Sequence, residues 1–299
     1  MKQLVRLIGV TRIADLTSLD RAGVRVACAI RPTGHVLQVS NGKGAHAEVA
    51  AVAEAAELWA AEQGEPERWT FLDGVAHVKA QRLDARGDIW VPAEAVWCPP
   101  LGAPSMGRSV TRWTSNGLAA HPSLERALLH GLLEVIERHA LPDGWSERLV
   151  RGRCVYASDE NGFVLRAFEL TPKGCPVTVA GALLEDTEGG PVRLTAGYAA
   201  RLDPRDAVQA ACDEAFQSRL TDVQGAREDV SLGPGAEPPP WLRRQRASKR
   251  LGRAAKLDAR ALARKLRRPV AYVELVPGRL PVRVVKVFVE GFGVSELLT

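Results

Sequence analysis

The chain has 299 residues, of which 46% are hydrophobic and 25% are charged, and its formal net charge is +5. A chain of this length can bury a substantial core as one large domain or two small ones. No apolar run reaches the roughly 18 residues that a membrane-spanning helix needs, and the charged N-terminal sequence MKQLVRLIGVTRIADL does not resemble a secretory signal. The five cysteines are odd in number and far apart, which indicates a reducing compartment rather than disulfides or a cysteine-bound zinc. We therefore expect a cytoplasmic protein that does not associate with membranes.

The first part of the chain is expected to contain two strands and a strong helix. Strands are predicted at 24–30 and 35–39, and the segment SNGKG at 40–44 follows as a glycine-rich turn in which Lys43 is able to approach an anion. The spacing of a Walker phosphate loop is absent, and an ordinary glycine turn explains this segment equally well. The alanine-rich segment 46–62 predicts a helix.

Within that helix, Glu54 and Glu57 are three residues apart among mostly apolar neighbours. Buried carboxylates are costly unless they are paired, protonated or bound to a metal. The pair is therefore either a buried site that needs a cation or two solvent-facing glutamates on a surface helix.

The stretch 111–141 contains the polar turn SNG, the breaker Pro122 and then a helix with Ser123 as its N-cap. Residues three or four apart stack on one side of a helix. The polar side of this helix carries Arg126, His130, Glu134 and Glu137. Such a carboxylate pair beside an apolar face is a candidate metal site, although similar pairs also occur on ordinary solvated helices.

A third helix is predicted to start at Asp203 and Pro204. It carries Glu214 and Gln217 on one side, whereas Arg219 lies about 170° from the midpoint of that pair. Three helices thus carry acidic or amide groups at close spacing, and such groups are the ligands of magnesium with a polyphosphate. Three unrelated solvated faces are the alternative.

The remaining segments are predicted to be strands, a loop and a basic helix. Residues 63–111 are predicted to alternate short strands and turns, and further strands are predicted at 149–157, 163–170, 177–184, 270–276 and 282–289. The segment GPGAEPPP at 233–240 predicts a loop. Residues 243–268 are densely basic and predict a helix that is either a solvated face or a docking surface for an acidic peptide or partner. Nucleic-acid binding is not expected, because no aromatic interleaving accompanies the charge.

In this order, the segments resemble the YcaO-domain family. The resemblance is carried by SNGKG, AEAAELWAAE, SNGLAAHPSLERALLHGLLEVIERHA, GYAARLDPRDAVQAACDEAFQSRLTDVQGARED and VRVVKVFVEGFG, and it covers nearly the whole chain. It implies a single domain over residues 1–299 with the α/β (α+β) YcaO-type ATP-binding fold, in which mixed sheets and acidic helices surround a nucleotide.

The resemblance also implies a chemistry. Members of the family use ATP and Mg²⁺ to activate a backbone amide oxygen of a peptide, and the attacking nucleophile is a Cys, Ser or Thr side chain, an amine or external sulfide. The sequences ELWAAE and QSRLTDVQGARED are most similar to those of the family branch that works beside a TfuA protein. That branch resembles thioamide-forming enzymes. We therefore expect thioamide formation on a precursor peptide in the biosynthesis of a ribosomally made, modified peptide. A TfuA-like or other partner protein and a homodimer are also expected, and an azoline-forming cyclodehydratase is an alternative.

The resemblance assigns roles to individual residues, although it assigns no catalytic residue. Four glutamates are expected to bind magnesium: Glu54, Glu57, Glu134 and Glu137. Five further residues are expected to contact the nucleotide: Lys43, Arg138, Glu214, Gln217 and Arg219.

The first acidic motif departs from the family pattern. Ala50 stands where a serine is usual, and the loop after GKG is about three residues short. An ungapped alignment would therefore place Glu57 at the first glutamate and Ala60 at the second.

The central helix departs further. His121 and Pro122 replace a GN pair, and Arg126 replaces a glutamate one turn into the helix, while Glu125 lies about 100° around it. Reversing a charge close to Mg²⁺ costs roughly a few kcal/mol in nucleotide binding. The alternative from another functional class is therefore a degenerate YcaO scaffold that binds a precursor peptide or a partner enzyme without using ATP.

Overall fold

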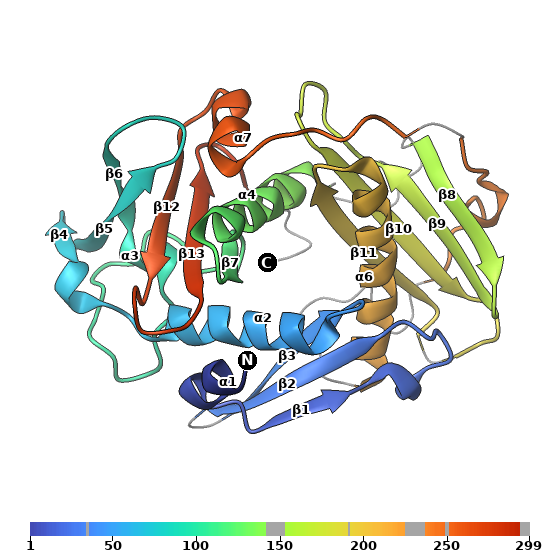
Figure 1. Cartoon of the computed structure of the whole chain (residues 1–299), viewed down its shortest axis with the longest axis horizontal. Coiled ribbons are helices and arrows are strands. Elements are labelled where there is room, and N and C mark those ends of the chain that lie inside the picture. Colours follow the sequence, from blue (N-terminus) through green and yellow to red (C-terminus); the bar gives the residue numbers. More distant parts are fainter. Residues whose placement is uncertain (34–35, 142–152, 191, 225–236, 249–250, 294–299) are drawn as a thin grey trace.

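The computed structural model describes residues 1–33, 36–141, 153–190, 192–224, 237–248 and 251–293. Three antiparallel sheets and three long helices dominate these residues, in agreement with the predicted mixed α/β class. The long helices are α2 (Ala47–Glu62), α4 (Leu124–Ala140) and α6 (Pro204–Gln224). Figure 1 shows them around the centre of the molecule, with the sheets toward the outside.

The N-terminal sheet has the strand order β1-β2-β3 and packs on α2. Its elements are α1 (Lys2–Ile8), β1 (Arg12–Asp15), η1 (Thr17–Leu19), β2 (Val26–Thr33) and β3 (Val36–Lys43). The prediction of a turn over SNGKG is wrong, because Ser40 to Lys43 continue β3 and pair with β2. A Cβ on Gly42 would meet the Ala47 carbonyl oxygen at 2.0 Å. Glycine is therefore required here for the close approach of α2 to the strand.

The second sheet combines strands from both halves of the chain, in the order β4-β5-β12-β13-β7 with β6 beside β5. Its strands are β4 (Thr70–Leu72), β5 (Val75–Arg82), β6 (Asp88–Pro92), β7 (Leu118–His121), β12 (Val270–Leu275) and β13 (Arg283–Val289). Two short helices, η2 (Pro66–Arg68) and α3 (Ala93–Val96), accompany it. The α4 helix packs its apolar face on β7 and β13. Ser123 precedes this helix, but its side chain makes no capping hydrogen bond with the described residues.

The third sheet has the order β11-β10-β9-β8, and α6 packs on β10 and β11. Its strands are β8 (Arg153–Glu160), β9 (Phe163–Glu169), β10 (Thr178–Asp186) and β11 (Leu194–Arg201). A Cβ on Gly197 would meet the Ala215 backbone nitrogen at 2.2 Å, so glycine again permits a helix to lie close to a strand. Residues 149–152 of the first predicted strand in this region lie outside the described residues.

The basic segment is not the continuous helix that its composition predicts. Its regular elements are η3 (Leu242–Arg244) and α7 (Ala259–Leu266), which is capped by the side chain of Asp258. Residues 245–248 and 251–257 have no regular structure, and residues 233–236 of the predicted loop lie outside the described residues. Within the part of the chain that the structure describes, no helix is long and apolar enough to cross a membrane.

Candidate functional site

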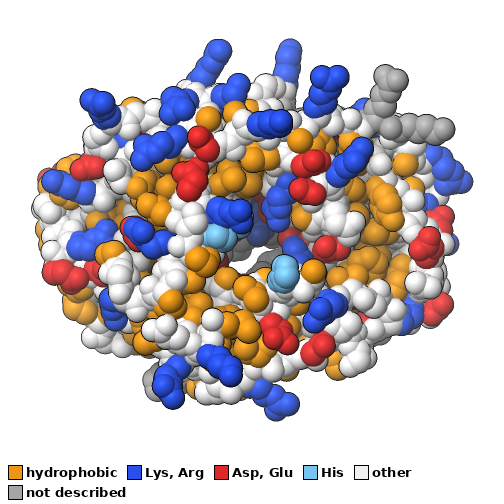
Figure 2. Space-filling model, in the orientation of Figure 1, with side chains coloured by type: hydrophobic (Ala, Val, Ile, Leu, Met, Phe, Trp, Pro, Cys, Tyr) orange, Lys and Arg blue, Asp and Glu red, His pale blue; other side chains and the backbone are white. Residues whose placement is uncertain are grey.

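Two neighbouring cavities lie between the three long helices. One has a volume of about 400 Å³ and the other of about 300 Å³, and they share Arg138 and Glu214 as lining residues. Of the nine predicted site residues, eight line one or both cavities: Lys43, Glu54, Glu57, Glu134, Glu137, Arg138, Glu214 and Gln217. Figure 2 shows a hollow near the centre of the displayed face, with acidic and basic side chains around it.

The two glutamates of α2 face different cavities. The Asn41 N–H of β3 donates to Glu54 Oε2 at 2.9 Å, and the Ala120 N–H of β7 donates to Glu57 Oε1 at 2.7 Å. Ala60, the second candidate in an ungapped alignment, is fully buried in the hydrophobic core. The structure therefore brings Glu54 and Glu57 together at the site.

The two glutamates of α4 are held in the same way. Glu134 accepts a hydrogen bond from the Gly117 N–H, and Glu137 Oε2 accepts one from the Ala200 N–H at 3.2 Å. Each of the four carboxylates is thus fixed by one backbone amide. A carboxylate has about four acceptor positions, so each retains acceptor capacity toward the cavities.

The pKa values of these carboxyl groups are raised, mainly because burial disfavours the charged form. Burial raises the pKa of Glu54 and of Glu137 to about 7, and it raises the pKa of Glu57 well above its ordinary range. Burial also raises the pKa of Glu134, against the opposing charges of Arg138 and Lys286. The four groups also repel one another, so a bound cation would stabilise their ionised forms.

Two positively charged side chains, Lys43 and Arg138, lie beside the carboxylates where the two cavities meet. Lys43 Nζ donates to Glu214 Oε2 at 2.6 Å, and Arg138 Nε lies 3.6 Å from Glu137 and 3.9 Å from Glu134. Burial alone would raise the pKa of Glu214, but Lys43 and Arg138 outweigh it and the pKa is lowered. Glu214 is therefore ionised at neutral pH, and Lys43 and Arg138 bring positive charge to the space where a polyphosphate would need it.

Lys286 is a charged residue beside the site that the sequence analysis did not identify. Its side chain is buried, its ammonium donates to the Thr114 carbonyl oxygen, and it lies 5.4 Å from the centre of the Trp113 ring. Burial lowers the pKa of Lys286 to about 8, while Glu134 and Glu57 act in the opposite direction. The sequence feature that could have identified Lys286 is its position as a single charged residue in the apolar run VVKVFV.

Asn41 is the second residue that sequence reasoning missed. Gln217 Nε2 donates to its carbonyl oxygen at 3.1 Å, and Asn41 Nδ2 donates to Thr221 Oγ1 at 3.4 Å. Its side-chain oxygen Oδ1 is buried and has no hydrogen-bond partner among the described residues. Buried polar atoms are rarely left unpaired, so this acceptor on the wall of the larger cavity fits a bound polar group.

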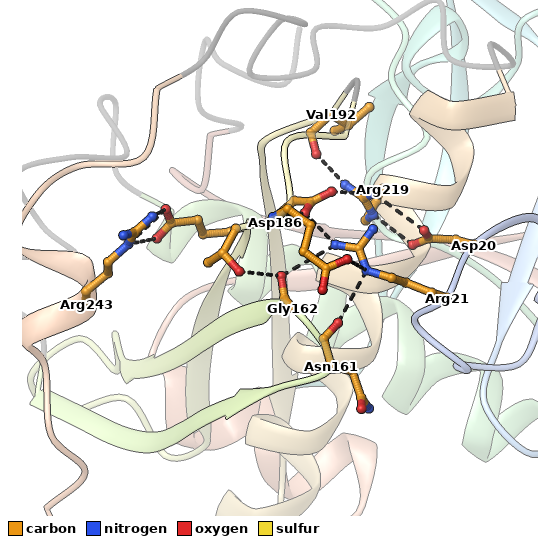
Figure 3. Close-up of polar contacts among 11 residues, drawn as sticks. Asp20, Arg21, Asn161, Gly162, Asp186, Val192, Arg219 and Arg243 are labelled. Carbon is orange, nitrogen blue, oxygen red and sulfur yellow. Dashed lines mark hydrogen bonds and ion pairs between the residues drawn. The ribbon is translucent and has the colours of Figure 1, made fainter.

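The structure does not bring Arg219 to the cavities. Its guanidinium is buried between Asp20, at 2.7 Å, and Asp186, at 2.8 Å, and it also donates to the Val192 carbonyl oxygen. Arg21 pairs with Asp186 from the other side (Figure 3). This network joins α6 to the N-terminal loop and to β10, which is a structural role.

Arg126, the main departure from the family pattern, is exposed and lines neither cavity. Glu125 does not replace the missing carboxylate, because its Oε1 accepts the Ala259 N–H at 2.7 Å and so caps α7. His121 follows Ala120 at the end of β7, and its ring centre lies 5.7 Å from that of His130, which lines the smaller cavity.

The donor set fits magnesium by chemistry, since carboxylate and amide oxygens are its preferred protein ligands. Within the described residues, no three His, Cys, Asp or Glu side chains are grouped closely enough to form a ready-made metal centre. Two of the carboxylates are instead engaged by cationic side chains, Glu214 by Lys43 and Glu137 by Arg138.

Comparison with known proteins identifies relatives of this chain and of its fold. The family model described as YcaO cyclodehydratase, ATP- and Mg²⁺-binding, matches residues 65–293. An uncharacterized protein from Methanothermobacter thermautotrophicus is 34% identical over 272 residues, which cover 75% of this chain and 69% of the relative. An uncharacterized protein in the tfuA 3′ region of Rhizobium leguminosarum bv. trifolii is 29% identical over 279 residues, covering 76% of this chain and 66% of the relative. The chain thus spans about two thirds of the length of these relatives.

A solved structure agrees with the fold. The structure of YcaO from Methanopyrus kandleri bound with AMPPCP and Mg²⁺ is similar with a TM-score of 0.73 and 25% identity. The similarity covers 99% of this chain and 90% of that chain. The arrangement of sheets and helices described above is therefore that of a protein that binds a nucleotide analogue and magnesium.

Proposed function

The chain belongs to the YcaO family, which is described as ATP- and Mg²⁺-binding, and we propose that it uses this pair to activate a backbone amide of a precursor peptide. The observation that carries the proposal is the convergence of four carboxylates from α2 and α4, each held by one backbone amide, on two cavities that share Arg138 and Glu214. An amide oxygen is a poor leaving group, and its phosphorylation makes it a good one.

In this proposal Glu54, Glu57, Glu134 and Glu137 hold magnesium, which supplies positive charge to offset that of the transferred phosphoryl group. Lys43 and Arg138 orient the phosphates by direct charge. Gln217 holds β3 through its hydrogen bond to the Asn41 carbonyl, so that the backbone donor to Glu54 stays in place. We assign no general acid or base, because positioning and charge are the main requirements of phosphoryl transfer.

We further propose that the product is a thioamide: a sulfur nucleophile from outside the peptide adds to the amide carbon, and the phosphorylated amide oxygen then leaves as phosphate. Two observations support this choice over an azoline: the sequences ELWAAE and QSRLTDVQGARED, and the relative whose gene lies in a tfuA 3′ region. The same relative supports a TfuA-like partner. A homodimer remains our expectation from the family.

The test is calorimetric titration of the full chain with ATP, with and without Mg²⁺, followed by magnesium-dependent ATP turnover. We expect magnesium-dependent binding by the native chain and its loss in Glu134→Ala. The matched control is Glu48→Ala, since Glu48 is an exposed glutamate on α2 that lines neither cavity. Normal turnover by Glu134→Ala would refute the role of that residue. No binding by the native chain at millimolar ATP, alone and with a TfuA-like partner, would refute the ATP-dependent function.

A second candidate is the degenerate scaffold that holds a precursor peptide or partner without using ATP. The observation that favours it is Arg126, which lies on the same helix as Glu134 and where the family pattern has a glutamate. Arg126→Glu separates the two. A large gain in nucleotide affinity supports a damaged site, whereas an unchanged affinity supports a site that works without a carboxylate at this position.

A further inference from the structure

A third cavity, of about 320 Å³, lies at the C-terminal end of α7 and is lined mainly by arginines. Arg82 comes from β5, Arg264 from α7, and Arg267 and Arg268 from the turn that leads into β12. Within the part of the chain that the structure describes, this arginine pocket shares no lining residue with either cavity of the candidate nucleotide site. It is therefore a separate feature that ATP binding does not explain.

The charge of the arginine pocket is not neutralised by its own residues. Asp84 is its acidic lining residue, and it is already engaged by Arg82 and by the Val270 N–H. Arg264 and Arg267 are exposed and form no ion pair within the described residues. Two guanidinium groups are thus available at the mouth of the pocket.

The backbone of Arg267 provides an independent observation. This residue follows α7 in the left-handed conformation, with φ 55° and ψ 35°, where glycine is the usual residue. A side chain at this position carries backbone strain that glycine would avoid. The left-handed turn places Arg267 and Arg268 together at the pocket.

The surroundings add long-range attraction for an anion. Residues 243–268 contain 12 of the 40 Lys and Arg residues but only one of the 35 Asp and Glu residues, so the rest of the chain is net acidic. Figure 2 shows basic side chains gathered along the upper edge of the displayed face, where Figure 1 places α7 and the segment that precedes it. The field of such a face steers acidic partners toward it.

We propose that the arginine pocket is a docking site for an acidic peptide segment, whose Asp and Glu side chains pair with Arg264 and Arg267. Guanidinium groups match carboxylates with two parallel hydrogen bonds. Among the described residues, no aromatic side chain lines the pocket, whereas proteins that hold single-stranded nucleic acid stack its bases on aromatic side chains. The Glu125 cap on α7 links this docking face to α4, which also carries Glu134 and Glu137. The inference goes beyond the proposed function and does not depend on an active ATP site.

The test measures binding of a fluorescent ten-residue peptide of alternating Asp and Gly by anisotropy at about 50 mM salt, with the Lys–Gly peptide and a single-stranded oligonucleotide as further probes. The native chain should bind the acidic peptide, and Arg264→Glu with Arg267→Glu should lower the affinity at least about tenfold, since two charge pairs become repulsive. The matched control is Arg253→Glu with Lys256→Glu, which makes the same charge change at exposed positions outside the pocket. It should lower the affinity by no more than about threefold.

Equal losses in the two double variants, no binding of the acidic peptide by the native chain, or tighter binding of the oligonucleotide would overturn the proposal. Arg267→Gly guards against misfolding, because glycine relieves the strain while it removes the charge; it should raise Tm and still weaken peptide binding. ATP affinity, measured in parallel, should be the same in all variants. Peptide binding without ATP binding would refute the proposed function and leave the docking site standing.

Discussion

The first prediction concerns Glu54→Gln, which removes the negative charge of a half-buried side chain and keeps its size. In the native chain, burial raises the pKa of Glu54 from 4.5 to about 7, against the hydrogen bond from the Asn41 N–H. The glutamine carbonyl oxygen can still accept that hydrogen bond. The variant therefore separates the charge of Glu54 from its packing.

The magnitude follows from the pKa difference between the unfolded and folded states. A carboxyl group whose folded-state pKa is raised destabilises the folded protein when it ionises. This cost is absent below about pH 4.5, grows as the pH rises and is complete above about pH 7. Each pKa unit corresponds to about 1.4 kcal/mol, so the full cost is about 3 kcal/mol. Glu54→Gln should relieve most of this cost at pH 8 and little of it at pH 5.

The assay is urea unfolding of the native chain and the variant at pH 5 and pH 8, without Mg²⁺ or nucleotide. We expect Glu54→Gln to gain about 2–3 kcal/mol of unfolding free energy at pH 8 relative to its gain at pH 5, and to lose magnesium-dependent ATP binding. Glu48→Gln, on the exposed side of the same helix, should change neither property. An equal effect of Glu54→Gln at both pH values, or ATP binding that is unaffected, would refute the reasoning.

Three further predictions follow from the same structure. Binding of ATP with Mg²⁺ at pH 7 should release at least about one proton, because Glu54 and Glu137 each have a pKa of about 7 and are half protonated beforehand. Glu57, whose pKa is raised well above its ordinary range, adds to the release. Calorimetry in two buffers of different ionisation enthalpy measures the total, and proton uptake would contradict the prediction. Arg219→Ala should lower the free energy of unfolding by about 3 kcal/mol, because Asp186 loses a buried partner. Its ATP affinity should be unchanged. A loss of ATP binding without a loss of stability would instead support the nucleotide-contacting role that the sequence predicts for Arg219. Gly42→Ala should cost about 2 kcal/mol or more in urea unfolding, since its Cβ would meet a backbone oxygen, whereas Gly293→Ala, which has open space, should be nearly neutral.

The helices were predictable because their signals are strong and local. Alanine content identified α2, apolar periodicity identified α4, and the Asp203–Pro204 start identified α6. Strands β1, β7 and β11 were not predicted, since β1 and β7 are short and β11 is rich in Gly and Ala, which have low strand propensity. The prediction of a turn at SNGKG was wrong because Gly42 permits close packing of α2 on a strand. The prediction of one continuous basic helix was wrong because the Ala and Leu content of this charged segment suggested a single element, whereas only Ala259–Leu266 form an α-helix.

The site was predictable as far as residue type and helical spacing determine it. The 170° offset of Arg219 from Glu214 and Gln217 already indicated that it faces elsewhere, and the structure places it in the Asp20 and Asp186 network. The backbone N–H groups that hold the four glutamates have no sequence signature, because every residue except proline has one. Lys286 was missed since its partners lie on other elements, and only the sheet order brings β13 beside α4.

The cost of the acidic cluster bears on the choice between an ATP-using enzyme and a degenerate scaffold. Four carboxyl groups with raised pKa values lower the stability of the ligand-free protein at neutral pH. Each of these carboxyl groups also accepts a hydrogen bond from a backbone amide, which favours its ionised form. Arg138 and Lys286 offset only part of that cost, and a scaffold that only holds a peptide binds no metal ion to offset the rest, whereas magnesium would offset it directly. Arg126 does not change this balance, because it is exposed and lines neither cavity. The electrostatics of the site therefore favour the ATP-using enzyme.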